Sequence, residues 1–131
     1  MMEPCWLDMH DVCAIQGEIL AESGGTSGVL DKGALESTLN LYNYGEDVTL
    51  YHLAASYGYG LVKNHCFVDG NKRIALIAVY TFLSVNGIEL TASEVDTAKF
   101  FLALAATSET QESSMEKLAS WLQHNSEILP T

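Results

Sequence analysis

The spacing of apolar side chains predicts helices along most of the chain. In residues 6–22 they recur three or four positions apart, which is typical of a helix with one buried face. Asp8 or Asp11 lies near the start of this helix and can cap it. The glycine-rich stretch 24–28 then breaks the helix and is expected to form a flexible loop.

A short second helix is predicted after the glycine-rich stretch. Asp31 is a suitable N-cap residue because its side chain can accept a hydrogen bond from a free backbone N–H of the first turn. Apolar residues at helical spacing continue as far as Leu41. We expect residues 42–47 to end this helix.

The third and fourth helices are predicted on either side of a polar loop, residues 65–70. The third helix covers residues 48–64 and contains two glycines, each of which costs about 1 kcal/mol relative to Ala inside a helix. We therefore expect Gly58 and Gly60 to mark close packing against another helix. The fourth helix covers residues 71–85 and is apolar on nearly every side, as is typical of a helix buried in the middle of its domain.

The last part of the chain predicts two more helices. Asn86 and Gly87 form a typical C-terminal stop for the fourth helix. Thr91 or Ser93, followed by an acidic residue, can begin a fifth helix that continues to Ala105.

A polar linker is expected over residues 107–114, followed by a final amphipathic helix over residues 115–122. No run of alternating apolar and polar residues is long enough to predict a sheet. The pattern therefore predicts an all-α fold, with about six helices around a central buried helix. At this length we expect a single domain over residues 1–131.

The distribution of charge narrows the classes of partner. The chain has 17 acidic residues and only 6 Lys and Arg residues, for a formal net charge of −11. This acidity argues against direct nucleic-acid binding, which needs a broad basic surface. Half of the basic residues nevertheless lie next to the polar loop: Lys63, Lys72 and Arg73. Such a local cationic cluster in an acidic protein indicates a specific anion site.

The cysteines and the start of the chain suggest a reducing compartment. The chain has three cysteines, namely Cys5, Cys13 and Cys66, and no C-x-x-C pair. This odd number and spacing indicate neither a disulfide framework nor a zinc site. The first residues do not resemble a secretory signal, and the longest apolar run is shorter than the roughly 20 residues that span a bilayer. We expect a cytoplasmic protein with no membrane segment.

The polar loop carries side chains suited to proton transfer and metal binding. Histidine changes its charge readily near neutral pH, so His65 is a candidate general base for a hydroxyl group. Asp69 offers hard oxygen ligands that suit Mg²⁺ shared with phosphates. Gly70 allows a tight turn and a close approach to a ligand.

The residues that follow the loop predict a phosphate cradle. Asn71, Lys72 and Arg73 place side-chain donors beside the free backbone N–H groups of a helix start, where the helix dipole favours an anion. Phe67 and Val68 are expected to pin the loop, with Phe67 pointing into the core. Together these residue types imply transfer of a phosphate-containing group to a hydroxyl. The alternative is a surface loop with ordinary helix caps and unrelated charges.

Residues 65–73, which read HCFVDGNKR, resemble the signature of the Fic/Doc superfamily, H-x-F-x-D/E-G-N-x-R. The stretch 24–37 is similar to the family's G-G-x-x-G and D-x-G-x-L-E-S segments, and residues 82–87 are similar to its F-L-x-x-N-G. The match looks closest to the Doc (death-on-curing) branch. In that branch a lysine follows the asparagine, as Lys72 does, and the final Arg of Fic enzymes is absent, where Leu76 stands here.

The resemblance implies a role for each matching residue. His65 would be the general base that takes the proton from a target hydroxyl, Asp69 would hold Mg²⁺, and Phe67 would be structural. The implied ligands are ATP and Mg²⁺. The nucleotide phosphates would be bound by four consecutive residues: Gly70, Asn71, Lys72 and Arg73.

The Doc branch also implies a reaction and partners. Most Fic proteins transfer AMP, whereas in the Doc branch the nucleotide binds in the reversed sense and its γ-phosphate is transferred. Lys72 and Leu76 place this chain on the kinase side. Doc proteins are toxins that modify a Thr of elongation factor Tu, a translation factor. They are paired with a Phd-type antitoxin whose disordered tail folds onto the toxin.

Two alternative functions stay open, namely AMP transfer and a catalytically idle Fic-fold protein that works by binding a partner. Lys63 is either a contact for the target or a phosphate, or an ordinary solvated lysine. The stretch 24–28 is either a flap that aligns a target segment or a plain helix connector. A catalytic role for Cys66 is disfavoured because little around it would activate a thiol. The other histidines are expected to be structural or exposed: His10, His52 and His124.

Overall fold

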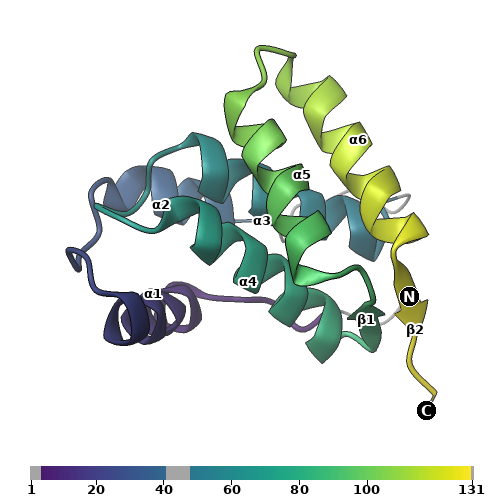
Figure 1. The fold of residues 1–131 in the computed structure, drawn as a ribbon, viewed down its shortest axis with the longest axis horizontal. Helices are drawn as coiled ribbons and strands as arrows, with labels where there is room; N and C mark the ends of the chain where they lie inside the picture. The colour runs from purple at the N-terminus through teal and green to yellow at the C-terminus, as the bar shows by residue number, and fades with distance from the viewer. Residues whose placement is uncertain (1–3, 41–47, 131) are drawn as a thin grey trace.

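The computed structural model describes residues 4–40 and 48–130, and this part of the chain contains six helices and two short strands (Figure 1). In chain order the elements are α1 (Met9–Ser23), α2 (Lys32–Leu39), α3 (Leu50–Lys63), α4 (Asn71–Val85), β1 (Ile88–Leu90), α5 (Glu94–Ala106), α6 (Gln111–His124) and β2 (Ser126–Ile128). The predicted helical architecture is confirmed.

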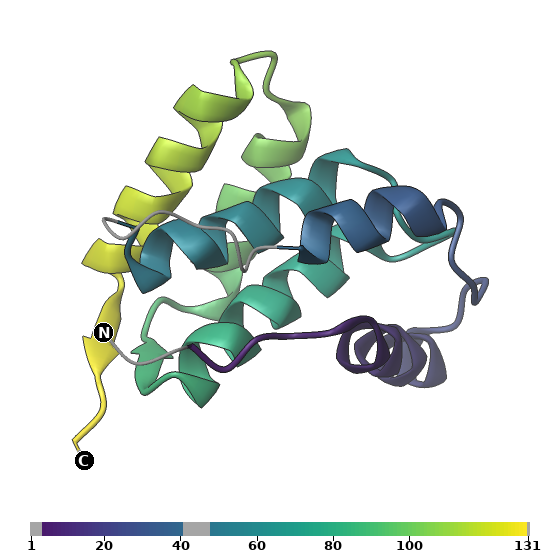
Figure 2. The same ribbon diagram turned by 180° about the vertical axis from the view of Figure 1, so that it is seen from behind.

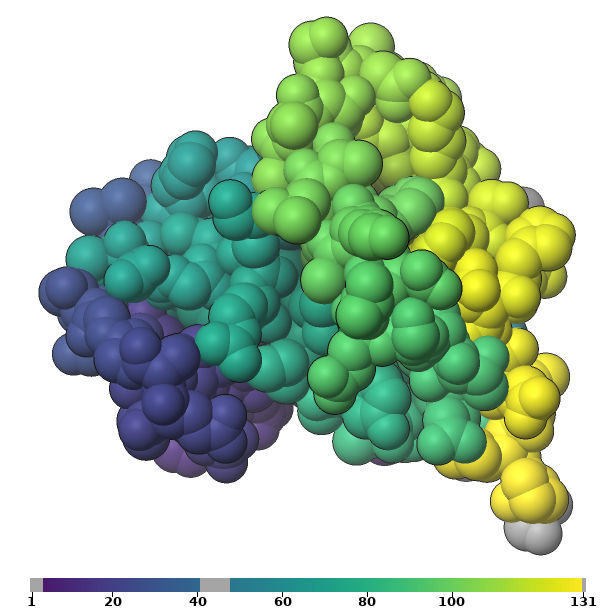
Figure 3. All heavy atoms as spheres, in the orientation of Figure 1, coloured from purple at the N-terminus to yellow at the C-terminus, as the bar shows by residue number. Residues whose placement is uncertain are grey.

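The helices α3 and α4 form the centre of the molecule. α3 packs against α4, α6 and α2, while α4 also packs against α1, α5 and β1. Figures 1 and 2 show α1 at one end of this central pair and α5 with α6 at the other. In the space-filling view the α5 and α6 residues form a lobe that protrudes from one end and is continuous with the rest of the molecule (Figure 3). The stacked rings of Phe100 and Trp121, 4.7 Å apart, join the two helices of that lobe.

Side-chain caps begin five of the helices. Asp8 and Asp11 form a reciprocal capping box at α1, so both residues proposed for this start take part in it. Asp31 accepts a hydrogen bond from the Ala34 N–H at α2, and Ser93 rather than Thr91 caps α5. Thr49 and Thr110 cap α3 and α6 in the same way. The exception is α4, whose N-cap residue makes no side-chain hydrogen bond.

Several predicted boundaries are wrong. The last helix begins at Gln111, because the hydroxyl of Thr110 accepts the Ser113 N–H and the polar residues that follow form a helical turn instead of a linker. Polarity alone does not distinguish the first turn of a helix from a loop. The first helix begins at Met9, three residues later than predicted. The second helix ends at Leu39, two residues earlier than predicted, and residues 42–47, which were expected to end it, lie outside the described residues.

The two strands form a small antiparallel sheet that the sequence pattern does not predict. Ile88 pairs with Ile128, and Leu90 pairs with Ser126. Each strand has three residues, which is too short for an alternating pattern to be recognised. The sheet follows the predicted stop at Gly87, whose φ of 84° is favourable for glycine. It leaves the fold predominantly helical.

The central helix α4 is buried toward its neighbours but not on every side. Its buried residues are Ile74, Ala75, Ala78, Val79, Phe82 and Leu83. Tyr80 and Val85 are about half exposed, so one strip of this apolar helix faces solvent. The prediction of a central helix is correct, while that of complete burial is not. No helix in the described ranges, 4–40 and 48–130, is long and apolar enough to cross a membrane.

The two glycines of α3 mark close packing, as predicted. A Cβ atom at Gly58 would lie 2.9 Å from a methyl group of Val79 on α4. One at Gly60 would lie 2.5 Å from a methyl group of Thr38 on α2. Thr38 cannot easily move away, because its hydroxyl donates to the Ala34 carbonyl and accepts from the Asn64 side chain.

The same substitution at two helical glycines is expected to have opposite effects on stability. Gly60→Ala should lower the free energy of unfolding by about 1 kcal/mol, because overpacking outweighs the gain in helix propensity. Gly17→Ala on α1 should raise it by about 0.5–1 kcal/mol, because nothing lies within 4 Å of the added methyl group. Urea denaturation of both variants measures the difference. A stabilised Gly60→Ala protein would contradict the packing argument.

Candidate active site

A cavity of about 540 Å³ lies at the N-terminal end of α4. It is lined by Val62, Lys63, His65, Val68, Asp69, Gly70, Asn71, Lys72, Arg73 and Ala105. The structure therefore brings together in one cavity all seven residues proposed from the sequence as catalytic, metal, phosphate or target contacts. α3 ends on one side of the cavity, α4 begins on the other, and α5 contributes its C-terminal end.

The start of α4 is arranged to receive an anion. Gly70 is in the left-handed region with φ of 81°, and it makes no side-chain capping bond. The first intrahelical bond runs from the Ile74 N–H to the Gly70 carbonyl, and the N–H groups before Ile74 have no acceptor within the helix. The positive end of the helix dipole and the exposed side chains of Lys72 and Arg73 lie at the same point.

Asn71 holds the shape of the loop before α4. Its side-chain N–H donates to the Phe67 carbonyl at 2.9 Å, and its side-chain oxygen accepts the Phe67 N–H at 3.0 Å. Because the side chain is used in this way, we expect Asn71 to contact a phosphate through its backbone N–H. The sequence predicts the residue at the site but not this second task.

Phe67 anchors the loop in the core, as predicted. Its side chain is 1% exposed, and its backbone forms an isolated antiparallel bridge with Val29. Val68 is 45% exposed and lines the cavity. The prediction that Val68 pins the loop is therefore wrong: neighbouring residues in an extended segment point to opposite sides.

The glycine loop, defined as residues 24–28, lies against the polar loop of residues 65–70. The Val68 N–H donates to the Gly28 carbonyl at 3.1 Å. Just after the glycine loop, the N–H groups of Leu30 and Asp31 both donate to the Cys66 carbonyl. A Cβ atom at Gly25 would lie 2.8 Å from a carboxylate oxygen of Asp69. The glycine loop thus packs against the polar loop and against Asp69, although none of its residues lines the cavity.

His65 and Lys63 lie where α3 ends. His65 has φ of 46°, in the left-handed region, and its side chain is exposed to the cavity. The ammonium group of Lys63 donates to the backbone carbonyls of Ala105 and Thr107, at 3.1 and 2.8 Å. A cation is favourable at this C-terminal end of α5, where the helix dipole is negative. Lys63 therefore holds α5 beside the histidine in this structure.

Asp69 is suited to a metal ion that arrives with a phosphate. One carboxylate oxygen accepts the Gly70 N–H at 2.9 Å, and the other faces Gly25. Within the described residues, no group of three or more His, Cys, Asp or Glu side chains could hold a metal ion on its own. Mg²⁺ typically keeps several waters and binds through one or two carboxylates together with substrate phosphates. A single exposed carboxylate fits that mode.

Cys66 lies inside the protein, behind the loop. Its sulfur is 3.9 Å from the Thr38 hydroxyl, and burial raises the pKa of the Cys66 thiol. Since the thiolate is the reactive form, this environment does not suit a nucleophile. Cys5 and Cys13 are also free thiols, in line with the absence of a predicted disulfide.

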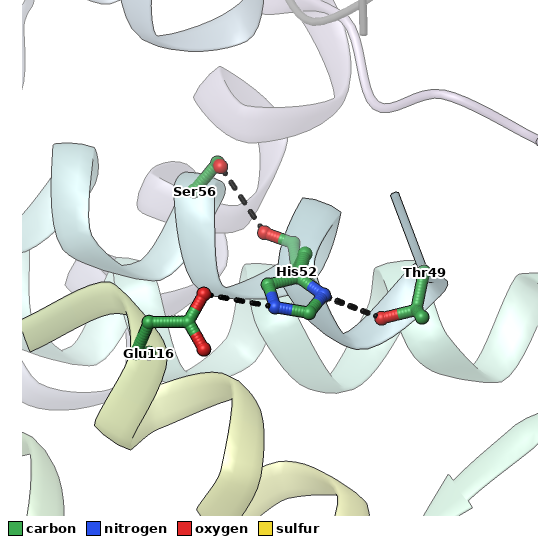
Figure 4. A network of polar contacts seen from close by, with 4 residues as sticks. All are labelled: Thr49, His52, Ser56 and Glu116. Carbon is green, nitrogen blue, oxygen red and sulfur yellow. Dashed lines mark hydrogen bonds and ion pairs between the residues drawn. The ribbon is translucent and has the colours of Figure 1, made fainter. Parts of the chain in front are cut away.

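His52 joins two helices outside the cavity (Figure 4). Its Nδ1 lies 2.8 Å from Thr49 Oγ1, and its Nε2 lies 3.1 Å from Glu116 Oε1 on α6. This histidine is structural. The other two, His10 on α1 and His124 on α6, are exposed and do not line the cavity. His65 is therefore the histidine that the structure places in the cavity at the start of α4.

Comparison with known proteins agrees with the resemblance seen in the loop. Residues 6–83 match the Fic/DOC family, a range that covers more than half of the chain and includes every residue from His65 to Arg73. The chain is 34% identical to Toxin Doc of Mycolicibacterium smegmatis over 108 residues, which cover 78% of this chain and 81% of the relative. It is 29% identical to Protein kinase doc of Escherichia phage P1 over 85 residues, covering 62% and 68% of the two chains.

Proposed function

This chain belongs to the Doc branch of the Fic/DOC family, and from that premise we propose that it is a Doc-type toxin with protein kinase activity. It would use ATP and Mg²⁺ to phosphorylate a hydroxyl, such as a Thr of elongation factor Tu. One observation carries the proposal. A histidine, a single carboxylate, three cationic side chains and a helix start with no side-chain cap share one cavity.

The geometry supports a direct transfer to the target hydroxyl. The imidazole of His65 would accept the proton of the target hydroxyl as its oxygen attacks the γ-phosphorus. The bond between that phosphorus and the β–γ bridging oxygen breaks, and ADP leaves with the electron pair. The backbone N–H groups at the start of α4, together with Lys72 and Arg73, would stabilise the charge on the phosphates. Asp69 would hold Mg²⁺, which supplies further charge neutralisation when bound.

Two positions on one face of α4 support γ-phosphoryl transfer over AMP transfer. Leu76 lies one helical turn after Lys72, so both side chains project from the same face. Lys72 is exposed at the cavity, whereas Leu76 packs against the hydrophobic core. This face therefore carries the long cationic side chain of Lys72, and it carries Leu76 where Fic enzymes have their final Arg. The resemblance to the Doc branch implies this arrangement for a nucleotide that binds in the reversed sense.

The proposed partners follow from the same family. We propose that a Phd-like antitoxin binds this chain through a segment that folds on binding. The target would be a translation factor, which places the reaction in the cytoplasm. The net charge of −11 argues against a direct nucleic-acid partner, and we propose no membrane contact.

Labelled ATP is expected to distinguish the three candidate functions. The protein is incubated with Mg²⁺, elongation factor Tu and ATP labelled at either the α- or the γ-phosphate, with a His65→Asn variant as the control. We expect label on the factor from γ-labelled ATP only, and none with the variant. Label from the α-phosphate would instead show AMP transfer. No label from either, across candidate targets, would favour the partner-binding role.

A further inference from the structure

Gln16 is a polar residue on the buried face of α1. Its side chain is 5% exposed, and it lies between the buried apolar residues Val12, Ile15 and Ile19 of the same helix. A buried amide is unfavourable unless its donors and acceptor are hydrogen-bonded. The contacts that satisfy it therefore indicate why a polar residue stands at this position.

All the hydrogen bonds of the Gln16 side chain go to the backbone of the two loops around the site. Its amide nitrogen donates to the carbonyls of Gly28 and Asp69, each at 3.3 Å. Its oxygen accepts the Gly28 N–H, also at 3.3 Å. One side chain thus connects the end of the glycine loop to the residue proposed to hold the metal.

Gln16 makes its hydrogen bonds at the end of the backbone pairing between the two loops. The Gly28 carbonyl also accepts the Val68 N–H, so Gln16 extends that pairing by one residue, to Asp69. From Asp69 the chain turns into Gly70, whose N–H binds one carboxylate oxygen, while the other oxygen faces Gly25. The direction of the carboxylate therefore depends on the two segments that Gln16 holds together.

We propose that Gln16 is a positioning residue, which holds the Asp69 carboxylate in the direction needed to bind Mg²⁺ with the nucleotide phosphates. This inference rests on the proposed function. It adds to the site a residue outside the loop motif, 53 positions from Asp69 in the chain. A residue that orients a metal ligand without touching the metal typically changes metal affinity or activity by about 10- to 100-fold when it is replaced.

Two substitutions separate the contacts of Gln16. Gln16→Met keeps the length of the side chain and removes all three hydrogen bonds. Gln16→Glu keeps the acceptor for the Gly28 N–H but places an oxygen against the carbonyls of Gly28 and Asp69. The matched control is Gln123, which is exposed on α6 and does not line the cavity, changed in the same two ways.

The first measurement is a Mg²⁺ titration of the full chain with a non-hydrolysable ATP analogue, followed by the NMR signal of the Gly70 amide. We expect the Mg²⁺ midpoint to rise about tenfold or more in Gln16→Met and Gln16→Glu, and to stay unchanged in both Gln123 variants. The midpoint of Mg²⁺-dependent phosphoryl transfer should shift by the same factor. A purely structural role would lower stability and leave these midpoints unchanged.

The second measurement is amide hydrogen exchange, which needs neither nucleotide nor activity. The Gly28 and Val68 amides should exchange faster in Gln16→Met, while the amides of α3 keep their protection. Unchanged exchange at Gly28 and Val68 would overturn the inference. The inference would also be overturned if the Mg²⁺ midpoint of Gln16→Met were within about twofold of the wild-type midpoint. A wild-type chain that shows no Mg²⁺-dependent response to the analogue would overturn the proposed function, and this inference with it.

Discussion

Replacing His65 with Asn is expected to reduce phosphoryl transfer by about 10²- to 10⁴-fold, the usual contribution of a general base. Among the described residues, His65 is the only histidine whose side chain lines the cavity at the start of α4. Asparagine is the appropriate replacement because His65 has φ of 46°, and Asn tolerates this left-handed conformation better than Ala does. The loss should therefore reflect chemistry and not a change in the loop.

The controls for this prediction use the same substitution elsewhere. His10→Asn, at an exposed position on α1, should leave the rate of transfer unchanged. His65→Asn should keep the wild-type unfolding midpoint and the wild-type affinity for the nucleotide, since the imidazole is proposed to act on the target hydroxyl. If His65→Asn retained more than about a tenth of the wild-type rate, the general-base role would be wrong.

Phe67→Ala is expected to lower the free energy of unfolding by about 3–5 kcal/mol, as is typical when a buried aromatic side chain is removed. The ring is 1% exposed, and the backbone on both sides of it is held by Asn71 and by the bridge to Val29. The loop around the anion site cannot close the resulting space without breaking those bonds. Most domains are stable by only about 5–15 kcal/mol, so the variant should be close to unfolding.

Urea denaturation at low temperature measures this loss, with Val68→Ala as the neighbouring control. Val68 is 45% exposed, and its truncation should change stability by no more than about 0.5 kcal/mol. A loss of less than about 1 kcal/mol in Phe67→Ala would show that the loop does not depend on this anchor. A loss as large in Val68→Ala would contradict the assignment of the two side chains to opposite sides.

The helical fold could be predicted from the sequence because its signals are local. Apolar spacing and capping residues such as Asp31 and Ser93 act within one or two turns, and the structure uses them as expected. The start of α6 and the small sheet could not be predicted in the same way. The turn after Thr110 is polar like a loop, and each strand is only three residues long. The pairing of the strands also depends on partners distant in the chain.

The site also combines a part that depends on neighbouring residues with a part that depends on distant segments. His65 and the residues from Val68 to Arg73 reach one cavity because a single loop and the next helical turn carry them. The contacts that support this loop connect segments far apart, as in the bonds from Lys63 to the carbonyl of Thr107 and from Gln16 to that of Asp69. One signal for Gln16 was present in the sequence: a polar residue at a core-facing position of an otherwise apolar helix face.

The hydrogen bonds from Lys63 to α5 also determine when the site can be assembled. During synthesis, the loop proposed to bind phosphate is made before Ala105, which lines the cavity, and before Thr107, whose carbonyl binds Lys63. The packing partner α6 of α3 and the pairing partner β2 of β1 are made later still. A chain of which only the first part has been made therefore carries the polar loop without the elements that hold it. Ala105 of α5 lines the cavity, so the proposed site cannot be complete before α5 has been made.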